Sequence, residues 1–176
     1  DELQIIMQNC INILNNFSLA ASTQMNNFDR KNQIEKVQKY ILKCISIFPH
    51  DFDFDCLLTD IIARITFEYP SFQIKEMALR TSIKRNIKSM NLFSICLNQI
   101  QYLISIEVQG KNDQISDKLF LSCLKYLDIS SDCWFNNNNL DLAENLGHIV
   151  YIIEYVIDRK PFKFVNSMLP IAEKII

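Results

Sequence analysis

Apolar residues recur every three or four positions along almost the whole chain, and this periodicity constrains the fold more than any other feature. In the first segment the pattern consists of Leu3, Ile6, Cys10, Ile13, Phe17 and Ala20. Similar patterns cover residues 32–48, 57–65, 71–88, 91–107, 119–127 and 141–157. Such spacing places side chains on one face of an α-helix. The sequence therefore predicts an all-α protein of about eight helices.

Four residues bear on where the expected helices begin, bend or end. Asp113 or Ser116 is expected to cap the helix that contains residues 119–127, because short polar side chains accept hydrogen bonds from the first free amides of a helix. Pro161 suits the first turn of the last helix. Pro170 is expected to bend or split that helix, because proline lacks an amide hydrogen.

Glycine is scarce, since Gly110 and Gly147 are the only two in the sequence. Phosphate-binding loops and dinucleotide fingerprints need several glycines at fixed spacing, because only glycine lets the backbone approach a phosphate closely. Neither motif can be built from this sequence. Folds rich in β-hairpins are also disfavoured, because their turns depend on glycine.

Size and composition indicate a single folded domain over residues 1–176. The chain is 49% hydrophobic and 22% charged, with a formal net charge of −2, which is typical of a globular protein. A net charge so near zero excludes a strong basic field over the whole molecule. The chain opens on Asp1 and ends on Ile176 within an apolar pattern, so we expect it to be a fragment of a longer polypeptide.

The six cysteines indicate an intracellular protein, nuclear or cytoplasmic, with reduced thiols. They contain no CxxC pair, and most of them lie within apolar helical patterns, where cysteine acts as a small hydrophobic residue. A secreted disulfide framework is the alternative. No membrane span is expected, since the most apolar stretch, HIVYIIEYVI, is too short and contains Glu154.

One helix pair carries a family resemblance. The segment CLLTDIIARITFEYPSFQIKEMALRTSIKRNI, residues 56–87, has an Ile- and Leu-rich first helix, Pro70 in the turn, and Ile74-Lys75 followed by Ala78. This pattern resembles a HEAT repeat. It departs from the family at Tyr69, where an Asp is usual, and at Met77, where a small residue is usual. The resemblance implies antiparallel helix pairs stacked as an α-solenoid, and the recurrence of pairs about every 40–47 residues is compatible with it.

The stretch FPHDFDFDCLLTD, residues 48–60, is the strongest candidate for a metal site. Asp51, Asp53 and Asp55 match the start of an EF-hand loop, but Cys56 and Ile62 occupy the positions that need Gly and Glu. The dipeptide His50-Asp51 resembles the motif of metal-dependent HD phosphohydrolases. That family needs a further His upstream, and residues 1–49 contain none.

A helix junction explains the same stretch without a metal. Pro49 would halt the preceding helix, and Asp53 or Asp55 would cap the next one. Phe52 and Phe54 would pack against the helix ends as a hydrophobic staple. We favour this interpretation and expect no cofactor.

His148 gives a second, weaker candidate for metal chemistry. It follows Glu144 as E-x-x-x-H, whereas di-iron bundles use E-x-x-H twice. We therefore expect an ordinary hydrogen-bonded or exposed histidine.

Basic residues cluster in two of the predicted helices. Lys36, Lys39 and Lys43 share one helical face, as do Arg80, Lys84 and Lys88, with Arg85 beside them. If the two helices are the second members of adjacent repeats, these faces lie side by side. They would then bind an acidic or phosphorylated protein segment or a nucleic-acid backbone, although ordinary solvated faces would have the same sequence.

The segment DISSDCWFNNNN, residues 128–139, is expected to be a flexible connector. Its Trp134 either packs back onto the fold or serves as an anchor in an interface.

These observations favour a non-catalytic scaffold or adaptor, a helical-repeat segment of a subunit in a larger complex with other proteins. The alternative is a nucleic-acid-binding module that uses the same basic faces. A third hypothesis is an all-α enzyme built on His50 and the neighbouring Asp residues.

Overall fold

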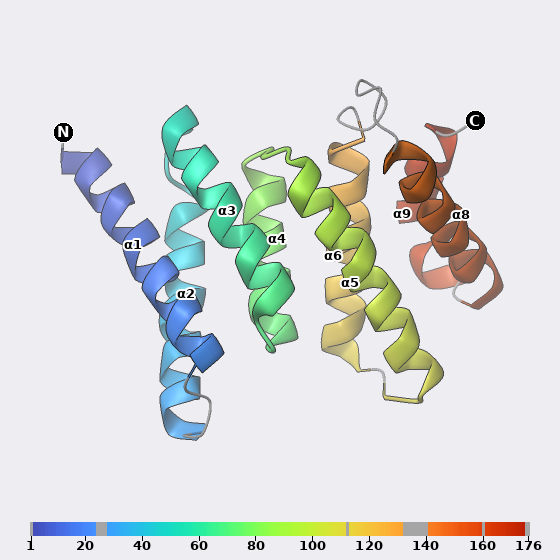
Figure 1. Ribbon diagram of the computed structural model, residues 1–176, viewed down its shortest axis with the longest axis horizontal. Coiled ribbons are helices and arrows are strands. Elements are labelled where there is room, and N and C mark those ends of the chain that lie inside the picture. The colour runs from blue at the N-terminus through green and yellow to red at the C-terminus, as the bar shows by residue number, and fades with distance from the viewer. Residues whose placement is uncertain (1, 24–27, 112, 132–140, 160, 175–176) are drawn as a thin grey trace. The chain divides into compact units, whose positions relative to one another are not determined.

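The computed structural model describes residues 2–23, 28–111, 113–131, 141–159 and 161–174. Within these ranges the chain forms eight α-helices and no strand, which confirms the all-α prediction (Figure 1). The helices are α1 (Glu2–Thr23), α2 (Phe28–Ile45), α3 (Phe52–Glu68), α4 (Phe72–Lys84), α5 (Met90–Val108), α6 (Gln114–Ile129), α8 (Asp141–Arg159) and α9 (Pro161–Glu173).

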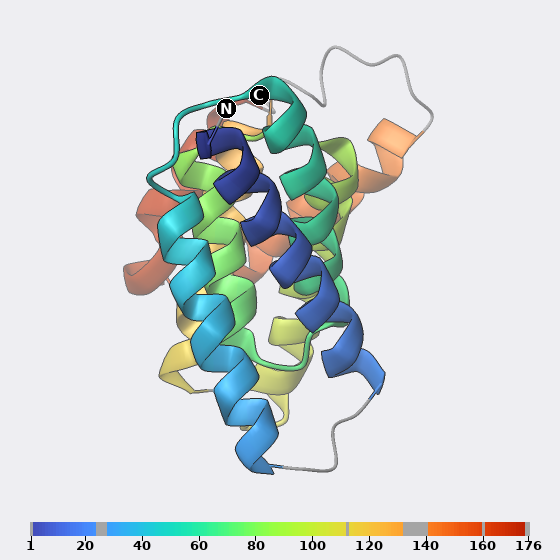
Figure 2. The same cartoon turned by 90° about the vertical axis from the view of Figure 1, so that its left-hand side faces the viewer.

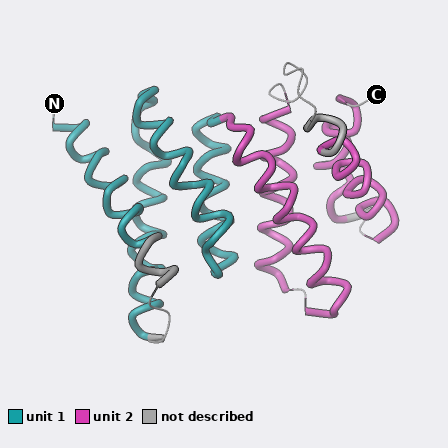
Figure 3. The backbone as a smooth tube through the Cα atoms, in the orientation of Figure 1, with its two compact units in different colours: residues 1–87 teal, residues 88–176 magenta. Residues whose placement is uncertain are grey.

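The chain divides into two compact units, residues Asp1–Ile87 and Lys88–Ile176 (Figure 3). In unit 1, α1 packs against α2 and α3 against α4, and the two pairs contact each other through α1 with α3 and α2 with α4. Unit 1 thus has two layers, one of α1 and α3 and one of α2 and α4 (Figure 2). Its core consists mainly of aliphatic side chains, among them Leu14, Leu42, Ile45, Leu58, Ile62, Ile65, Ile74 and Leu79.

Unit 2 repeats this arrangement with its own helices. Here α5 packs against α6 and α8 against α9, and the pairs meet through α5 with α8 and α6 with α9. Phe120 and Phe164 stack between α6 and α9 with ring centroids 4.8 Å apart. Lys174 Nζ lies 2.7 Å from Asp128 Oδ1 across the same pair of helices. Two stacked helix pairs in each unit agree with the expected repeat, while the continuous solenoid stays a prediction.

The end of α4 differs from the expected range of 71–88. Asn86 adopts a left-handed conformation with φ of 51°, the amide of Asn86 bonds to Ile83 O, and the amide of Ile87 bonds to Ser82 O, both at 3.0 Å. This pair of bonds is a Schellman motif, which ends a helix. The helix therefore ends at Lys84, and Lys88 does not extend its basic face.

The last helix begins at Pro161, as predicted, but it is not split at Pro170. Proline removes one backbone hydrogen bond there. The flanking side chains of Met168 and Ile171 are buried, so packing holds this turn in the helix.

In the described part of the chain, no helix combines the length and apolarity needed to cross a bilayer.

Asp113 begins α6 with a complete capping box. Its carboxylate accepts a 2.7 Å hydrogen bond from the Ser116 amide, and the Ser116 hydroxyl lies 2.9 Å from the Asp113 amide. These contacts confirm the first of the two predicted caps. The bonds from Ser116 lower the pKa of Asp113, because they favour the ionised carboxyl group.

Replacing the cap tests how much it contributes to unit 2. Asp113→Ala is expected to reduce the free energy of unfolding by about 1 kcal/mol, and Asp113→Asn by less, because Asn still accepts the amide bond. Because the pKa of Asp113 is lowered in the folded protein, Asp should give a higher free energy of unfolding than Asn. This difference is complete above the ordinary carboxyl pKa of about 3.9 and is lost as the pH falls through the pKa that Asp113 has in the folded protein. Urea denaturation of the three proteins between pH 7 and pH 3 measures both effects. An advantage of Asp over Asn that grew on acidification would contradict this assignment.

Candidate functional site

Residues 48–60 form a helix junction. Asp51 is the residue that caps α3, since its backbone is extended (φ −140°, ψ 127°) and its Oδ1 accepts a 2.9 Å bond from the Phe54 amide. The expectation that Asp53 or Asp55 caps this helix is wrong, because both lie inside its first turn. Pro49 also does not end the preceding helix directly, since α2 stops at Ile45 and turn hydrogen bonds follow it.

The two phenylalanines of this junction differ sharply in exposure. Phe54 is 5% exposed and packs edge-on against Phe48, with ring centroids 6.2 Å apart. Phe52 is 83% exposed, so of the two only Phe54 packs at this junction. Its contact with Phe48 is not the expected staple, because with Asp51 as the cap the staple positions are His50 and Asp55. The amphipathic geometry of α3 explains the difference, since residues two apart on a helix point in different directions.

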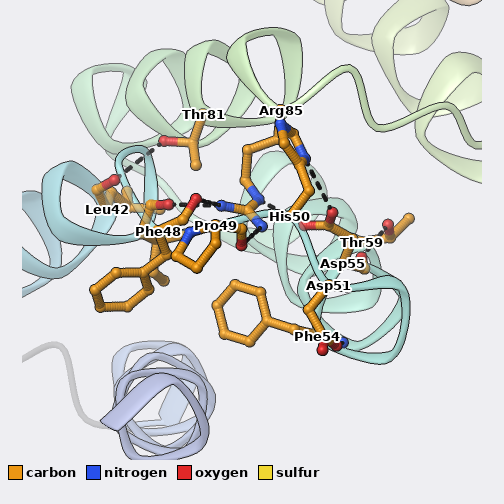
Figure 4. Close-up of polar contacts among 11 residues, drawn as sticks. Leu42, Phe48, Pro49, His50, Asp51, Phe54, Asp55, Thr59, Thr81 and Arg85 are labelled. Carbon is orange, nitrogen blue, oxygen red and sulfur yellow. Dashed lines mark hydrogen bonds and ion pairs between the residues drawn. The ribbon is translucent and has the colours of Figure 1, made fainter. Parts of the chain in front are cut away.

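Arg85 makes the most extensive set of polar contacts in this region (Figure 4). Its Nε donates to Asp55 Oδ1 at 2.5 Å, and its Nη1 donates to the carbonyls of Ile45 and Phe48, both at 2.9 Å. Its Nη2 donates to the carbonyl of Pro49 at 3.0 Å. The guanidinium thus joins the end of α4 to the end of α2, the following loop and the first turn of α3.

The burial of Arg85 corrects the expectation that it belongs to an exposed partner-binding face. The residue is 3% exposed, and its guanidinium carbon lies 5.1 Å from the centre of the Phe54 ring. Arginine suits this position because its planar group offers several donors at fixed angles. Periodicity placed Arg85 beside Lys84, but Arg85 is the C-cap of α4 and its side chain is turned into unit 1.

The remaining oxygen of Asp55 faces His50. The His50 Nδ1 and Asp55 Oδ2 atoms are 3.4 Å apart, and the His50 side chain is 67% exposed. Across the described residues, no group of three or more His, Cys, Asp or Glu side chains is placed to hold a metal ion. The acidic residues Asp51 and Asp55 instead have structural contacts, one as a helix cap and one as the partner of Arg85.

A groove of about 420 Å³ lies between α2 and α4 and brings together three of the predicted basic residues. We call it the basic groove, and its lining consists of Leu42, Lys43, Ser46, Met77, Arg80, Thr81, Ile83 and Lys84. Its cations are exposed, Leu42 and Thr81 are buried, and Met77 and Ile83 are half-buried. The groove therefore combines apolar side chains with three positive charges.

Contacts between α2 and α4 hold the two walls of the groove together. Lys39 Nζ donates to Gln73 Oε1 at 2.5 Å, and the Thr81 hydroxyl lies 3.4 Å from Leu42 O (Figure 4). Arg85 lies one helical turn beyond Thr81 and fixes both helix ends. The basic faces of α2 and α4 are thus adjacent, as the helix-pair arrangement requires.

The other predicted contact residues lie outside the groove. Lys36 is exposed on α2, and Lys39 is half-buried beside Gln73. Lys88 is exposed but is the first residue of unit 2. Trp134 falls outside the described residues, so the prediction for its side chain stays open.

Charge is divided between the two layers of unit 1. The sequences of α2 and α4 contain eight Lys and Arg against three Asp and Glu, whereas α1 and α3 contain one Arg against five Asp and Glu. Lys43 and Lys84 each lie in the last turn of their helix, where positive charge is also favoured by the helix dipole. The two helices that form the groove are therefore basic in sequence, whereas the two helices of the other layer are acidic.

Sequence reasoning missed the apolar part of the groove. The sequence indicates only that each helix has an apolar side, which includes Leu42, Met77 and Ile83. The half-buried state of Met77 and Ile83 depends on how α2 and α4 pack, which no single-helix pattern contains. Asp55 was likewise visible as an acid, but its partner lies 30 residues away in the chain.

No protein-family model, curated protein or solved structure matches this chain.

Removing the Arg85 guanidinium tests its structural role. Arg85→Met should lower the free energy of unfolding of unit 1 by about 3–5 kcal/mol, because one carboxylate and three carbonyl groups each lose a charged hydrogen-bond donor. Arg80→Met, on the exposed side of the same helix, should change it by less than about 0.5 kcal/mol. Urea denaturation followed by circular dichroism compares the two variants, and equal small effects would contradict the assigned role.

Proposed function

We propose that this chain is a non-catalytic helical-repeat segment that binds an acidic segment of another protein in the basic groove. The observation that carries the proposal is the groove itself, in which Lys43, Arg80 and Lys84 surround apolar side chains between two packed helices. Helix pairs that stack in layers are well suited to presenting such surfaces to other chains.

The chemistry of the groove supports a protein ligand with both acidic and apolar side chains. Arg80 has an acidic neighbour, since its Nε lies 3.5 Å from Glu76 Oε1. Among the described residues, Lys43 and Lys84 have no ion pair of their own, so their charges are available to a partner. The half-buried Met77 and Ile83 would become covered by an apolar side chain of the ligand.

We further propose that this chain acts together with other protein subunits. A helical-repeat segment of this kind would serve as a scaffold or adaptor in a larger intracellular complex. Cys96 and Cys123 are buried, where cysteine acts as a small hydrophobic residue. The proposal assigns no catalytic role, because Asp51 and Asp55 of the acidic cluster already have structural partners.

Selection from a random peptide library on the full chain tests this proposal without a known partner. We expect the recovered peptides to carry acidic residues next to an apolar residue. The double variant Lys43→Glu/Lys84→Glu should bind them about tenfold more weakly or worse, because attraction becomes repulsion. Fluorescence anisotropy measures the dissociation constants.

Lys118→Glu/Lys125→Glu is the matched control, since it reverses two exposed lysines seven residues apart on α6. It should bind the peptides as the unmodified protein does. Recovery of peptides without acidic residues, or equal binding by both double variants, would contradict the proposal. Circular dichroism confirms that each variant is folded.

Nucleic-acid binding is the second candidate, supported by the excess of basic residues in α2 and α4. It predicts that random-sequence DNA or RNA is retarded in a gel shift at low salt. The affinity should fall steeply with salt, because bound phosphates release counterions. The apolar side chains of the groove favour the protein ligand instead, so our expected outcome is no retardation at about 0.15 M salt. A sharp, salt-sensitive shift abolished by Lys43→Glu/Lys84→Glu would favour the nucleic-acid function.

A further inference from the structure

One exposed side of α3, next to α1, carries an apolar residue between two acids. Asp53, Leu57 and Asp60 are all exposed, Leu57 to 46%. They are spaced at i, i+4 and i+7, which places them on one side of the helix. We call these three residues the acidic face of α3. In the described part of the chain, neither Asp53 nor Asp60 has an ion pair.

This face has the features that the basic groove would select in a ligand. Its two carboxylates are separated by about 10.5 Å along the helix axis, given a rise of 1.5 Å per residue. The exposed Leu57 lies between them. The groove offers three cations, Lys43, Arg80 and Lys84, around the apolar side chains of Leu42, Met77 and Ile83. Charge and apolar character therefore match between the two surfaces.

The two surfaces belong to different layers of unit 1. The acidic face is on α3, which lies beside α1 in one layer, whereas α2 and α4 form the other layer (Figure 2). The groove lies between α2 and α4. The α3 helix is also packed against α4 within the same molecule. Its acidic face cannot leave this position to fill its own groove, so any contact between the two surfaces requires two molecules.

We propose that the protein self-associates head to tail, with the acidic face of α3 in one copy docked in the basic groove of the next. Leu57 would lie against Met77 and Ile83, and Asp53 and Asp60 would pair with the surrounding cations. Such a contact is heterologous, so a pair of copies still has one groove and one acidic face available, and further copies can be added. This inference rests on the proposed function in one respect, namely that the groove is a binding site.

Sedimentation velocity on the full chain tests the proposal with two complementary variants. Lys43→Glu/Lys84→Glu removes the basic groove, and Asp53→Asn/Asp60→Asn removes the charges of the acidic face without creating a basic one that could bind the altered groove. The unmodified protein should form species larger than a dimer as its concentration rises, and about 1 M salt should dissociate them because charges are then screened within about 3 Å. Each variant alone should sediment as a monomer, which has a mass of 20.6 kDa.

An equimolar mixture of the two variants is the decisive sample. The intact acidic face of the groove variant can still attach to the intact groove of the other variant, but nothing can be added to the resulting pair. The mixture should therefore show an increase to twice the monomer mass and no larger species. Lys118→Glu/Lys125→Glu should associate as the unmodified protein does.

Three results would overturn the self-association. They are a monomer at every concentration, loss of association in the Lys118→Glu/Lys125→Glu control, and a mixture of the two variants that stays monomeric. If the protein is monomeric while acidic peptides still bind in the groove, the proposed function stands and the occupant is another protein. If neither peptides nor a second copy bind, both proposals fail.

Discussion

The buried guanidinium of Arg85 is the interaction on which the arrangement of unit 1 depends. It bonds to carbonyl oxygens of Ile45, Phe48 and Pro49 and to the carboxylate of Asp55. These groups belong to the end of α2, the loop after it and the first turn of α3, while Arg85 itself caps α4. Carbonyl groups at the end of a helix have no partner within that helix. The Arg85 side chain adds a donor for the last carbonyl of α2, which also accepts from the Phe48 amide, and at the same time it joins three helices.

The position of the basic groove follows from this arrangement. Because Arg85 holds the C-terminal ends of α2 and α4 together, Lys43 and Lys84, which lie in the last turns of those helices, come to line one groove. Positive charge at these helix ends is favoured by the helix dipoles. The same lysines can therefore stabilise their helices and attract an acidic ligand.

Helical periodicity was sufficient to predict that the described chain is helical, whereas the adjacency of the basic residues of α2 and α4 was expected only if the helices form repeat pairs. Local chemistry was also sufficient for Asp113, whose cap needs only a residue three positions away. The contact between Arg85 and Asp55 could not be predicted from local sequence, because the two residues are 30 positions apart in the chain. Asp51 caps α3 in place of Asp53 or Asp55. The sequence alone does not show which of these three acids precedes the first helical residue. Lys88 was placed on the α4 face because a left-handed Asn86 is not visible as a helix stop in an otherwise continuous pattern.

Hydrogen–deuterium exchange of Arg85→Met against the unmodified protein tests most directly whether Arg85 holds α2, α3 and α4 together. The account predicts faster exchange at the end of α2, in the loop that follows and at the end of α4, because local opening there no longer breaks the Arg85 bonds. Helices α5 and α6 of unit 2 should exchange as before and serve as the internal reference. Unchanged exchange in residues 41–55 and 80–87 would contradict the account.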